Sequence, residues 1–220
     1  PKSARSILAY PLCDAAALET ARGGILREGL AFDHCDVAIV TNIGCGDHLG
    51  INEIDTPEQL AEVKQCIVAA VPASGTAVLN AADPIVAAMA ASCPGEVIFF
   101  CADRHHPVMA THRAQGKRTV YVDDGHMVAS EGSVRGRVPL RDIPLTRNGT
   151  IGFQVENAMA AIATAWALGI DWEIAEQALA GFINDAQTAP GRFNVFDYKG
   201  ATLIADYGHN PDAMRALVAA

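Results

Sequence analysis

An apolar run that ends in ionisable side chains is the part of this sequence best suited to chemistry. Residues 36–50 read DVAIVTNIGCGDHLG, so a strand pattern ends in Thr41 and Asn42 and is followed by Asp47 and His48. Open α/β sheets bind their ligands at the carboxyl ends of their strands. An Asp–His pair at such a place is compatible with a structural hydrogen bond, with proton transfer, or with a metal such as manganese.

A second polar stretch lies upstream. Residues 15–19 predict a strand that ends in Glu19, and Arg22 follows, next to two glycines. The planar guanidinium of Arg22 can pair with a phosphate or a carboxylate, and the glycines allow a ligand to approach the backbone. A turn with a surface salt bridge is the alternative. Two neighbouring strand ends with these side chains favour a site for a metal and a phosphate.

Three further segments carry isolated polar side chains. Lys64 lies beside the apolar face of a helix predicted at 57–71, where a solvated lysine is the alternative interpretation. Asn80 and Asp83 follow an apolar strand, and they fit either a site or an ordinary turn and helix cap. Asn157 opens a helix of small and apolar residues, where it could hydrogen-bond a purine or simply pack.

The last polar groups surround a proline–glycine junction near residues 186–191. Arg192 could reach a ligand between two domains, and Asp206, which follows a strand, suits a ribose or a metal. His209 lies three residues further on. Four other histidines, at 105, 106, 112 and 126, have no ligand spacing and are predicted to be surface residues.

Alternating strand and helix patterns predict an α/β fold, with a mainly parallel sheet flanked by helices. The segment 102–150 is predicted to be a small antiparallel excursion on the sheet edge. Strands are expected near 15–19, 36–41, 76–80, 96–101, 118–123, 194–198 and 201–206, and helices near 57–71, 84–92, 153–168, 172–181 and 211–220.

Two domains are predicted, at residues 1–187 and 188–220. The chain begins without Met and ends inside a helical pattern, so both domains are expected to be truncated. The second would be the start of a Rossmann-like domain.

Composition excludes several classes of protein. The 16 basic and 25 acidic residues give a net charge of −9, which argues against a nucleic-acid binder. No apolar run reaches the roughly 20 residues that span a bilayer. Six cysteines without a CxxC pair predict buried, reduced thiols in a cytoplasmic protein.

The order of the motifs resembles the Mur ligase superfamily. The order is E-T-A-R-G-G, T-N-I before D-H-L-G, a lysine-bearing helix, L-N-A-x-D-P, x-N-A-x-A-A, P-G-R and D-Y-x-H-N-P. Within the superfamily, residues 19–30 together with Thr41-Asn42 and residues 47–50 are most similar to the cyanophycin synthetase family. This resemblance implies a central ATPase domain followed by a Rossmann-like domain.

The implied activity is ATP-dependent amide ligation. A carboxylate is phosphorylated to an acyl phosphate, an amine attacks, and phosphate leaves. In cyanophycin synthetases this half joins the α-amine of L-arginine to the aspartate side-chain carboxylate of cyanophycin, a polymer with a poly-aspartate backbone. The implied partners are therefore ATP, arginine and cyanophycin, without nucleic acid or membrane, and the full-length enzyme is expected to be a homo-oligomer.

The resemblance also implies a role for each matching residue. Glu19 and His48 would hold Mg²⁺ and act in catalysis with Lys64, which resembles a lysine that is carbamylated in the superfamily and so supports the metal. Arg22 and His209 would bind substrate. The residues that would bind the nucleotide are Thr41, Asn42, Asn80, Asp83, Asn157, Arg192 and Asp206.

The sequence departs from the family pattern at several positions. The phosphate loop G-x-x-G-K-T/S does not occur in the chain, Ala82 stands where an Asp is usual, and Phe153-Gln154 replaces a common His-Asn. This chain alone is therefore expected to bind ATP poorly and to catalyse nothing. The alternatives are another Mur-type ligase, acting on a peptidoglycan precursor or a folate, and a truncated, non-catalytic remnant.

Overall fold

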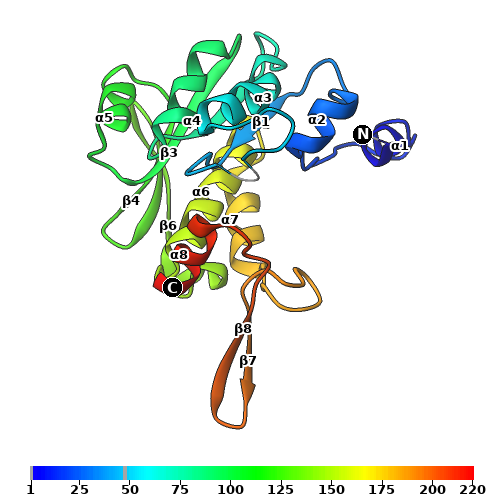
Figure 1. The fold of residues 1–220 in the computed structure, drawn as a ribbon. Helices are drawn as coiled ribbons and strands as arrows, with labels where there is room; N and C mark the ends of the chain where they lie inside the picture. Colours follow the sequence, from blue (N-terminus) through cyan, green and yellow to red (C-terminus); the bar gives the residue numbers. More distant parts are fainter. Residues whose placement is uncertain (1, 47–48) are drawn as a thin grey trace.

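The protein is built around one six-stranded sheet between two layers of helices (Figure 1). The computed structural model describes residues 2–46 and 49–220. The strands lie in sheet order as they occur in the chain, with the first four parallel and the last two antiparallel. They are β1 (Val37–Val40), β2 (Thr76–Asn80), β3 (Glu96–Asp103), β4 (Thr119–Asp123), β5 (His126–Glu131) and β6 (Ser133–Pro139).

Each face of the sheet is covered by its own helices. On one face α6 (Gly152–Ala167) packs along the parallel strands, and α7 (Trp172–Gly181) packs on α6. On the other face lie α3 (Pro57–Ala69), α4 (Pro84–Ala88) and α5 (Pro107–Ala114). The side chains of β2 alternate between the two cores, as a pleated strand requires. All five residues of β2 are buried, which is typical of a central parallel strand.

Local signals set where the main helices begin. Thr56 and Gln59 form a capping box at the start of α3, with Pro57 in the first turn. Asp83 caps α4, which continues as a short 3-10 helix at Met89–Ser92. Two more 3-10 turns, Leu140–Asp142 and Pro144–Thr146, lead from β6 to α6. Near the N-terminus lie α1 (Lys2–Leu8) and α2 (Arg22–Glu28).

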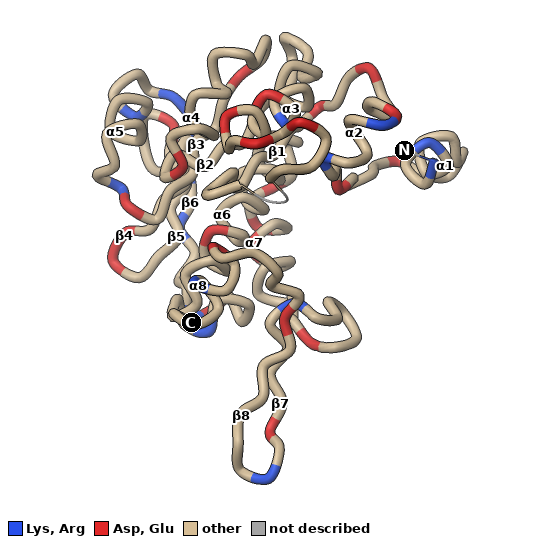
Figure 2. The backbone as a smooth tube through the Cα atoms, in the orientation of Figure 1, with Lys and Arg blue, Asp and Glu red and all other residues tan. Residues whose placement is uncertain are grey.

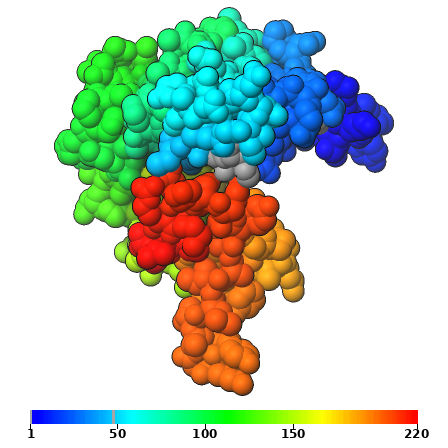
Figure 3. Space-filling model, in the orientation of Figure 1, coloured from blue at the N-terminus to red at the C-terminus, as the bar shows by residue number. Residues whose placement is uncertain are grey.

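The C-terminal segment consists of a two-stranded hairpin followed by a helix. Strands β7 (Asn194–Tyr198) and β8 (Ala201–Ala205) form a hairpin that projects away from the six-stranded sheet (Figure 1). Apolar side chains such as Phe196, Leu203 and Ile204 are exposed on it. Helix α8 (Pro211–Ala219) then returns to the body of the protein, where it meets the loop after β1 (Figure 3).

The α/β fold and its mainly parallel sheet are confirmed, and so is the antiparallel pairing at one edge. The predicted strand at 15–19 is wrong, because these residues have no strand structure. In the described part of the chain only one edge of β1 is paired. An extended segment becomes a strand only when a neighbour accepts its backbone hydrogen bonds. The sequence reading also missed α1, α2 and α5.

The surface prediction is wrong for one of the four histidines. His112 on α5 is buried, with Nε2 3.0 Å from the carbonyl oxygen of Val97 and its ring edge-on to Phe99 at 4.8 Å. Burial lowers the pKa of the imidazole, because the charged form loses its hydration. A histidine on the apolar side of a short helix packs as a neutral ring.

Charge is spread over the surface of many elements. Figure 2 shows Lys and Arg interspersed with Asp and Glu along the chain, in agreement with the net charge of −9. Among the described helices, none combines the length and the apolar character needed to cross a bilayer.

The lowered pKa of His112 predicts a pH-dependent stability. Below about pH 6.5 the unfolded chain binds a proton at this position more readily than the folded chain does, so stability decreases as the pH falls. We expect thermal melts between pH 7.5 and 5.5 to show a smaller decrease in Tm for His112→Gln than for the wild type. The exposed-site control His105→Gln should keep the wild-type slope. Equal slopes for all three proteins would contradict the assignment.

Candidate functional site

The carboxyl ends of β1 and β2 lie side by side, because the two strands are parallel and pair Val40 with Leu79. Thr41 and Asn42 therefore leave β1 at the same edge of the sheet at which Asn80 ends β2. Asn80 is buried, and its Oδ1 accepts a hydrogen bond from the backbone N–H of Ala82 at 2.9 Å. The amide of Asn42 makes a long contact of 3.4 Å with the hydroxyl of Thr41.

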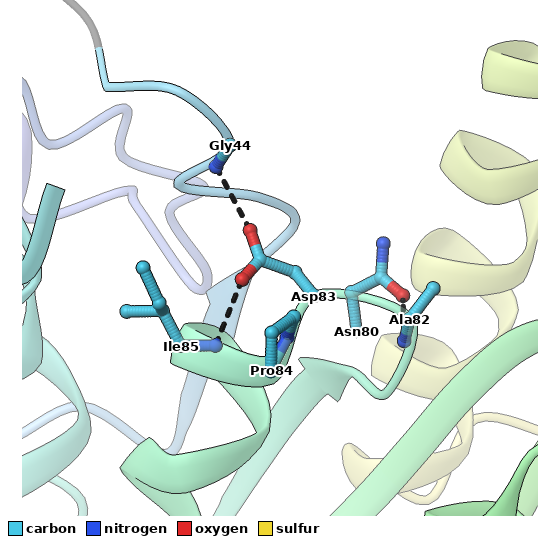
Figure 4. A pocket seen from close by; sticks show the side chains of 6 residues that line it. All are labelled: Gly44, Asn80, Ala82, Asp83, Pro84 and Ile85. Carbon is cyan, nitrogen blue, oxygen red and sulfur yellow. Dashed lines mark hydrogen bonds between the residues drawn. The ribbon is translucent and has the colours of Figure 1, made fainter.

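The Asp83 carboxylate joins two segments at this edge. Oδ1 accepts the backbone N–H groups of Ile85 and Val86 at 2.9 and 3.2 Å, which caps α4. Oδ2 accepts those of Ile43 and Gly44 at 2.7 and 2.9 Å, in the loop after β1. Figure 4 shows the carboxylate between Gly44 and Ile85. Both oxygens are thus engaged by the backbone.

An open cavity of about 350 Å³ lies at the same place (Figure 4). Two of the predicted nucleotide-binding residues, Asn80 and Asp83, contribute to its wall. The full lining is Gly44, Asn80, Ala82, Asp83, Pro84 and Ile85. Such a position, at the ends of parallel strands, is where α/β proteins bind ligands.

The predicted metal ligands are described only in part. Asp47 and His48 lie outside the described residues. Glu19 is exposed and lines a smaller cavity of about 60 Å³ beside Leu18, Thr20 and α2, whose first residue is Arg22. Lys64 is half-buried on α3. Within residues 2–46 and 49–220, no group of three or more His, Cys, Asp or Glu is placed to hold a metal ion.

Asn157 lies on the exposed side of α6 near its start. Its Nδ2 donates to Oε1 of Gln154 at 3.0 Å, and Gln154 itself is buried. The bond fixes the amide of Asn157 at the helix surface, in an orientation that leaves its oxygen able to accept a further hydrogen bond.

Three predicted residues gather around Tyr207. Asp206 directly follows β8 at the open end of the hairpin, where it accepts the N–H of Phe193 at 2.9 Å and that of Gly208 at 2.6 Å. The guanidinium of Arg192 lies over the Tyr207 ring at 5.7 Å, and the His209 ring lies 5.1 Å from the same ring. The structure therefore brings Arg192, Asp206 and His209 together.

Glu156 on α6 is a candidate functional residue that no sequence motif indicates. Burial raises the pKa of its carboxyl group. Burial is also the largest cause of the raised pKa of the Cys101 thiol on β3, to which the charge of Glu156 adds a smaller contribution. A carboxyl group with a raised pKa near the ends of parallel strands is a candidate functional group. The sequence does hold one indication of this residue: an acidic side chain between Val155 and Asn157, in a helix whose other residues are mostly small or apolar.

The comparison with known families decides where this architecture belongs. The sequence model of the Mur ligase middle domain matches residues 7–165, well over half of the chain. The chain belongs to the Mur ligase family. All six strands of the main sheet lie within the residues that match the Mur ligase middle domain.

Within the Mur ligase family, this chain shares high sequence identity with curated cyanophycin synthetases. The cyanophycin synthetase of Synechocystis sp. (strain PCC 6803) is 45% identical over 99% of this chain, and that of Geminocystis herdmanii is 43% identical over 96%. The chain spans about a quarter of the length of these two proteins, 25% and 24%. A 2,6-diaminopimelate-adding UDP-N-acetylmuramoyl-peptide ligase of Chlorobaculum tepidum is 27% identical, over 92% of this chain and 38% of its own length.

Solved structures support the fold. MurF from Acinetobacter baumannii superposes with a TM-score of 0.59 and 23% identity, over 82% of this chain and 36% of the MurF chain. At that identity the likeness concerns architecture alone. It agrees with a Mur ligase middle domain built on a largely parallel sheet.

The raised pKa of Glu156 predicts a stabilising substitution. A carboxyl group whose pKa is raised by burial contributes less stability as the pH rises past its ordinary value near 4.5. Glu156→Gln should therefore raise Tm at pH 7.5, by about 2 °C, and change it little at pH 4. Glu173→Gln, in the first turn of α7, removes an acid that favours the helix N-terminus and should not raise Tm. A lower Tm for Glu156→Gln at pH 7.5 would contradict the assignment.

Proposed function

We propose that this chain is part of an ATP-dependent amide ligase that joins the α-amine of arginine to the aspartate side-chain carboxylates of cyanophycin. The observation that carries the proposal is the 45% identity to a cyanophycin synthetase over nearly the whole chain. The identity to a peptidoglycan-precursor ligase is 27%. A cytoplasmic location and a homo-oligomeric intact enzyme belong to the same proposal.

The proposed nucleotide site uses the edge of the sheet and the C-terminal segment. Thr41, Asn42 and Asn80 would contact ATP from the strand ends, and Asn157 would accept or donate a hydrogen bond at the adenine. The cluster around Tyr207 would approach from the other side, with Arg192 at the phosphates and Asp206 at the ribose. Bound ATP would supply the phosphoryl group that activates the carboxylate as an acyl phosphate. The amine would then attack the acyl carbon, and phosphate would leave.

Substrate groups require charged and polar partners of their own. Arg22 is half-buried at the start of α2, where a guanidinium can pair with a carboxylate through two parallel hydrogen bonds. His209 lies beside Tyr207 and would bind substrate from the C-terminal segment. These two roles follow from the positions of the motifs.

Two of the three proposed ligands, Glu19 and a carbamylated Lys64, offer the oxygen atoms that magnesium prefers, whereas His48 offers a nitrogen. Mg²⁺ prefers oxygen ligands, and Glu19 offers an exposed carboxylate. The Lys64 side chain would become such a ligand on carbamylation, because the product carries a carboxylate-like group in place of an amine. His48 would complete the set and lies outside the described residues. Bound Mg²⁺ would neutralise charge on the transferring phosphoryl group.

We further propose that the chain divides near residue 188. Residues 1–187 would form the middle domain and 188–220 the start of the C-terminal domain. The family match ends at residue 165, α7 ends at Gly181 and β7 begins at Asn194. Between them Asp185 and Thr188 form a compact turn, in which Asp185 accepts the N–H groups of Gln187 and Thr188.

Substrate choice tests the proposal directly. In the intact ligase, we expect phosphate release from ATP to require both arginine and an aspartate-backbone polymer primer. A UDP-muramoyl peptide with diaminopimelate, or a folate with glutamate, should give no release above background. Phosphate release with either of these pairs, but not with arginine and the primer, would show that the protein has another Mur-type activity. Release with none of the three would favour a non-catalytic remnant.

Lys64 offers a sharper test of the chemistry. Lys64→Ala in the intact ligase should lower arginine-dependent phosphate release by about 100-fold, because a group that supports the metal is removed. Acetate or propionate should restore part of the rate, since a small carboxylate can take the place of the carbamate. The matched control Lys199→Ala, in the exposed turn between β7 and β8, should keep full activity. Unchanged activity of Lys64→Ala would remove Lys64 from the mechanism.

A further inference from the structure

The loop after β1 is held by carboxylates from two distant segments. Three consecutive backbone N–H groups, of Ile43, Gly44 and Cys45, all point at carboxylate oxygens. The first two bind Oδ2 of Asp83, and the third binds Oδ2 of Asp212 at 2.7 Å. Asp83 follows β2, whereas Asp212 lies 167 residues from Cys45, in the first turn of α8.

The contact with α8 has several components. The thiol of Cys45 lies 3.4 Å from Oδ1 of Asp212. Arg215, one turn further along α8, binds the same Oδ1 at 2.7 Å and lies 3.6 Å from the Cys45 sulfur. The hydrogen bond from the Cys45 backbone is the largest of the causes that hold the pKa of Asp212 below its ordinary value. The carboxylate is therefore charged at neutral pH.

The backbone conformation of Gly44 and its lack of a side chain both permit the contact with Asp212. Its φ is +55°, in the left-handed region that favours glycine. A Cβ built on Gly44 would overlap Oδ2 of Asp212. Successive N–H groups around a left-handed residue form a concavity that binds anions, and here the anions are two aspartate side chains of the same protein.

We propose that Asp83 and Asp212 are positioning residues, which together fix the loop 43–46 and couple it to the docking of α8. The proposal rests on the proposed function for its catalytic meaning, because this loop leads along the chain into Asp47 and His48. Asp83 holds the loop beside the carboxyl end of β2. Asp212 holds it only when α8 is docked, so both contacts form together only when α8 lies against the loop after β1, as in Figure 3.

Hydrogen exchange tests the clamp without any enzyme activity. In the 220-residue chain, Asp212→Asn should speed exchange about tenfold in the peptide that contains Cys45, and Asp83→Ser should do so at Ile43 and Gly44. Serine still caps α4, so Asp83→Ser separates the loop contact from helix capping. Asp197→Asn makes the same charge change on exposed β7 and should leave exchange at residues 43–46 unchanged. Unchanged exchange in both clamp variants would overturn the proposal.

A cross-link tests the docking of α8. Asp212→Cys places a second sulfur beside native Cys45, so mild oxidation should give a 45–212 disulfide, identified by peptide mass spectrometry. In the Cys45→Ser background the same oxidation should give no link to residue 212. The control Asp197→Cys measures how fast Cys45 forms a disulfide with a cysteine that is not expected to lie beside it. If the 45–212 disulfide formed no faster than a 45–197 disulfide, the docked position of α8 would be contradicted.

Kinetics of the intact ligase connect the clamp to catalysis. Asp212→Asn should lower kcat about tenfold while the KM for ATP stays within about twofold, because a loop is loosened and no nucleotide contact is lost. Asp212→Glu should recover part of kcat. Faster exchange without any kcat effect would refute the catalytic role. If wild-type enzyme showed no arginine-dependent turnover, the proposed function would fail, while exchange and cross-linking would still decide the clamp.

Discussion

Parallel pairing of β1, β2 and β3 is the constraint on which the arrangement of polar groups depends. Parallel strands that pair in register must end at the same edge of the sheet. Residues that are 40 positions apart in sequence, such as Ile43 and Asp83, therefore become hydrogen-bond partners. The site needs no special folding step, because the sheet that buries the core also collects the strand ends.

Much of the sheet and its helices could be predicted from the sequence, because the pattern of apolar residues is strongest where an element is completely buried. Strand β2 is buried on both faces, and Thr56-Pro57 marks the start of α3, so both elements begin at the residue that the sequence predicts. The helix of Trp172–Gly181 was predicted to the residue. The gathering of Asn80 and Asp83 at one cavity follows from the same reasoning about strand ends.

The errors have a common physical origin, since each concerns a partner that local sequence does not reveal. Residues 15–19 form a short apolar run ending in Glu19, and they pair with no strand among the described residues. His112 is polar in the sequence and neutral in a packed core, because Val97 offers it a carbonyl group. Asp212 was unremarkable in the sequence, and only the return of α8 to the loop after β1 gives it a partner.

The hairpin of β7 and β8 has a consequence for the behaviour of the protein in concentrated solution. Among residues 2–46 and 49–220 its two strands pair only with each other, and Phe196, Leu203 and Ile204 are exposed on it. Such a ribbon presents two free rows of backbone donors and acceptors beside apolar side chains, which is a template for adding strands from other molecules. Lys199 and Asp197 place charged side chains near the tip, and the loss of their hydration opposes stacking of one hairpin on another. About a dozen residues that contribute little to the core can therefore influence how the whole chain associates.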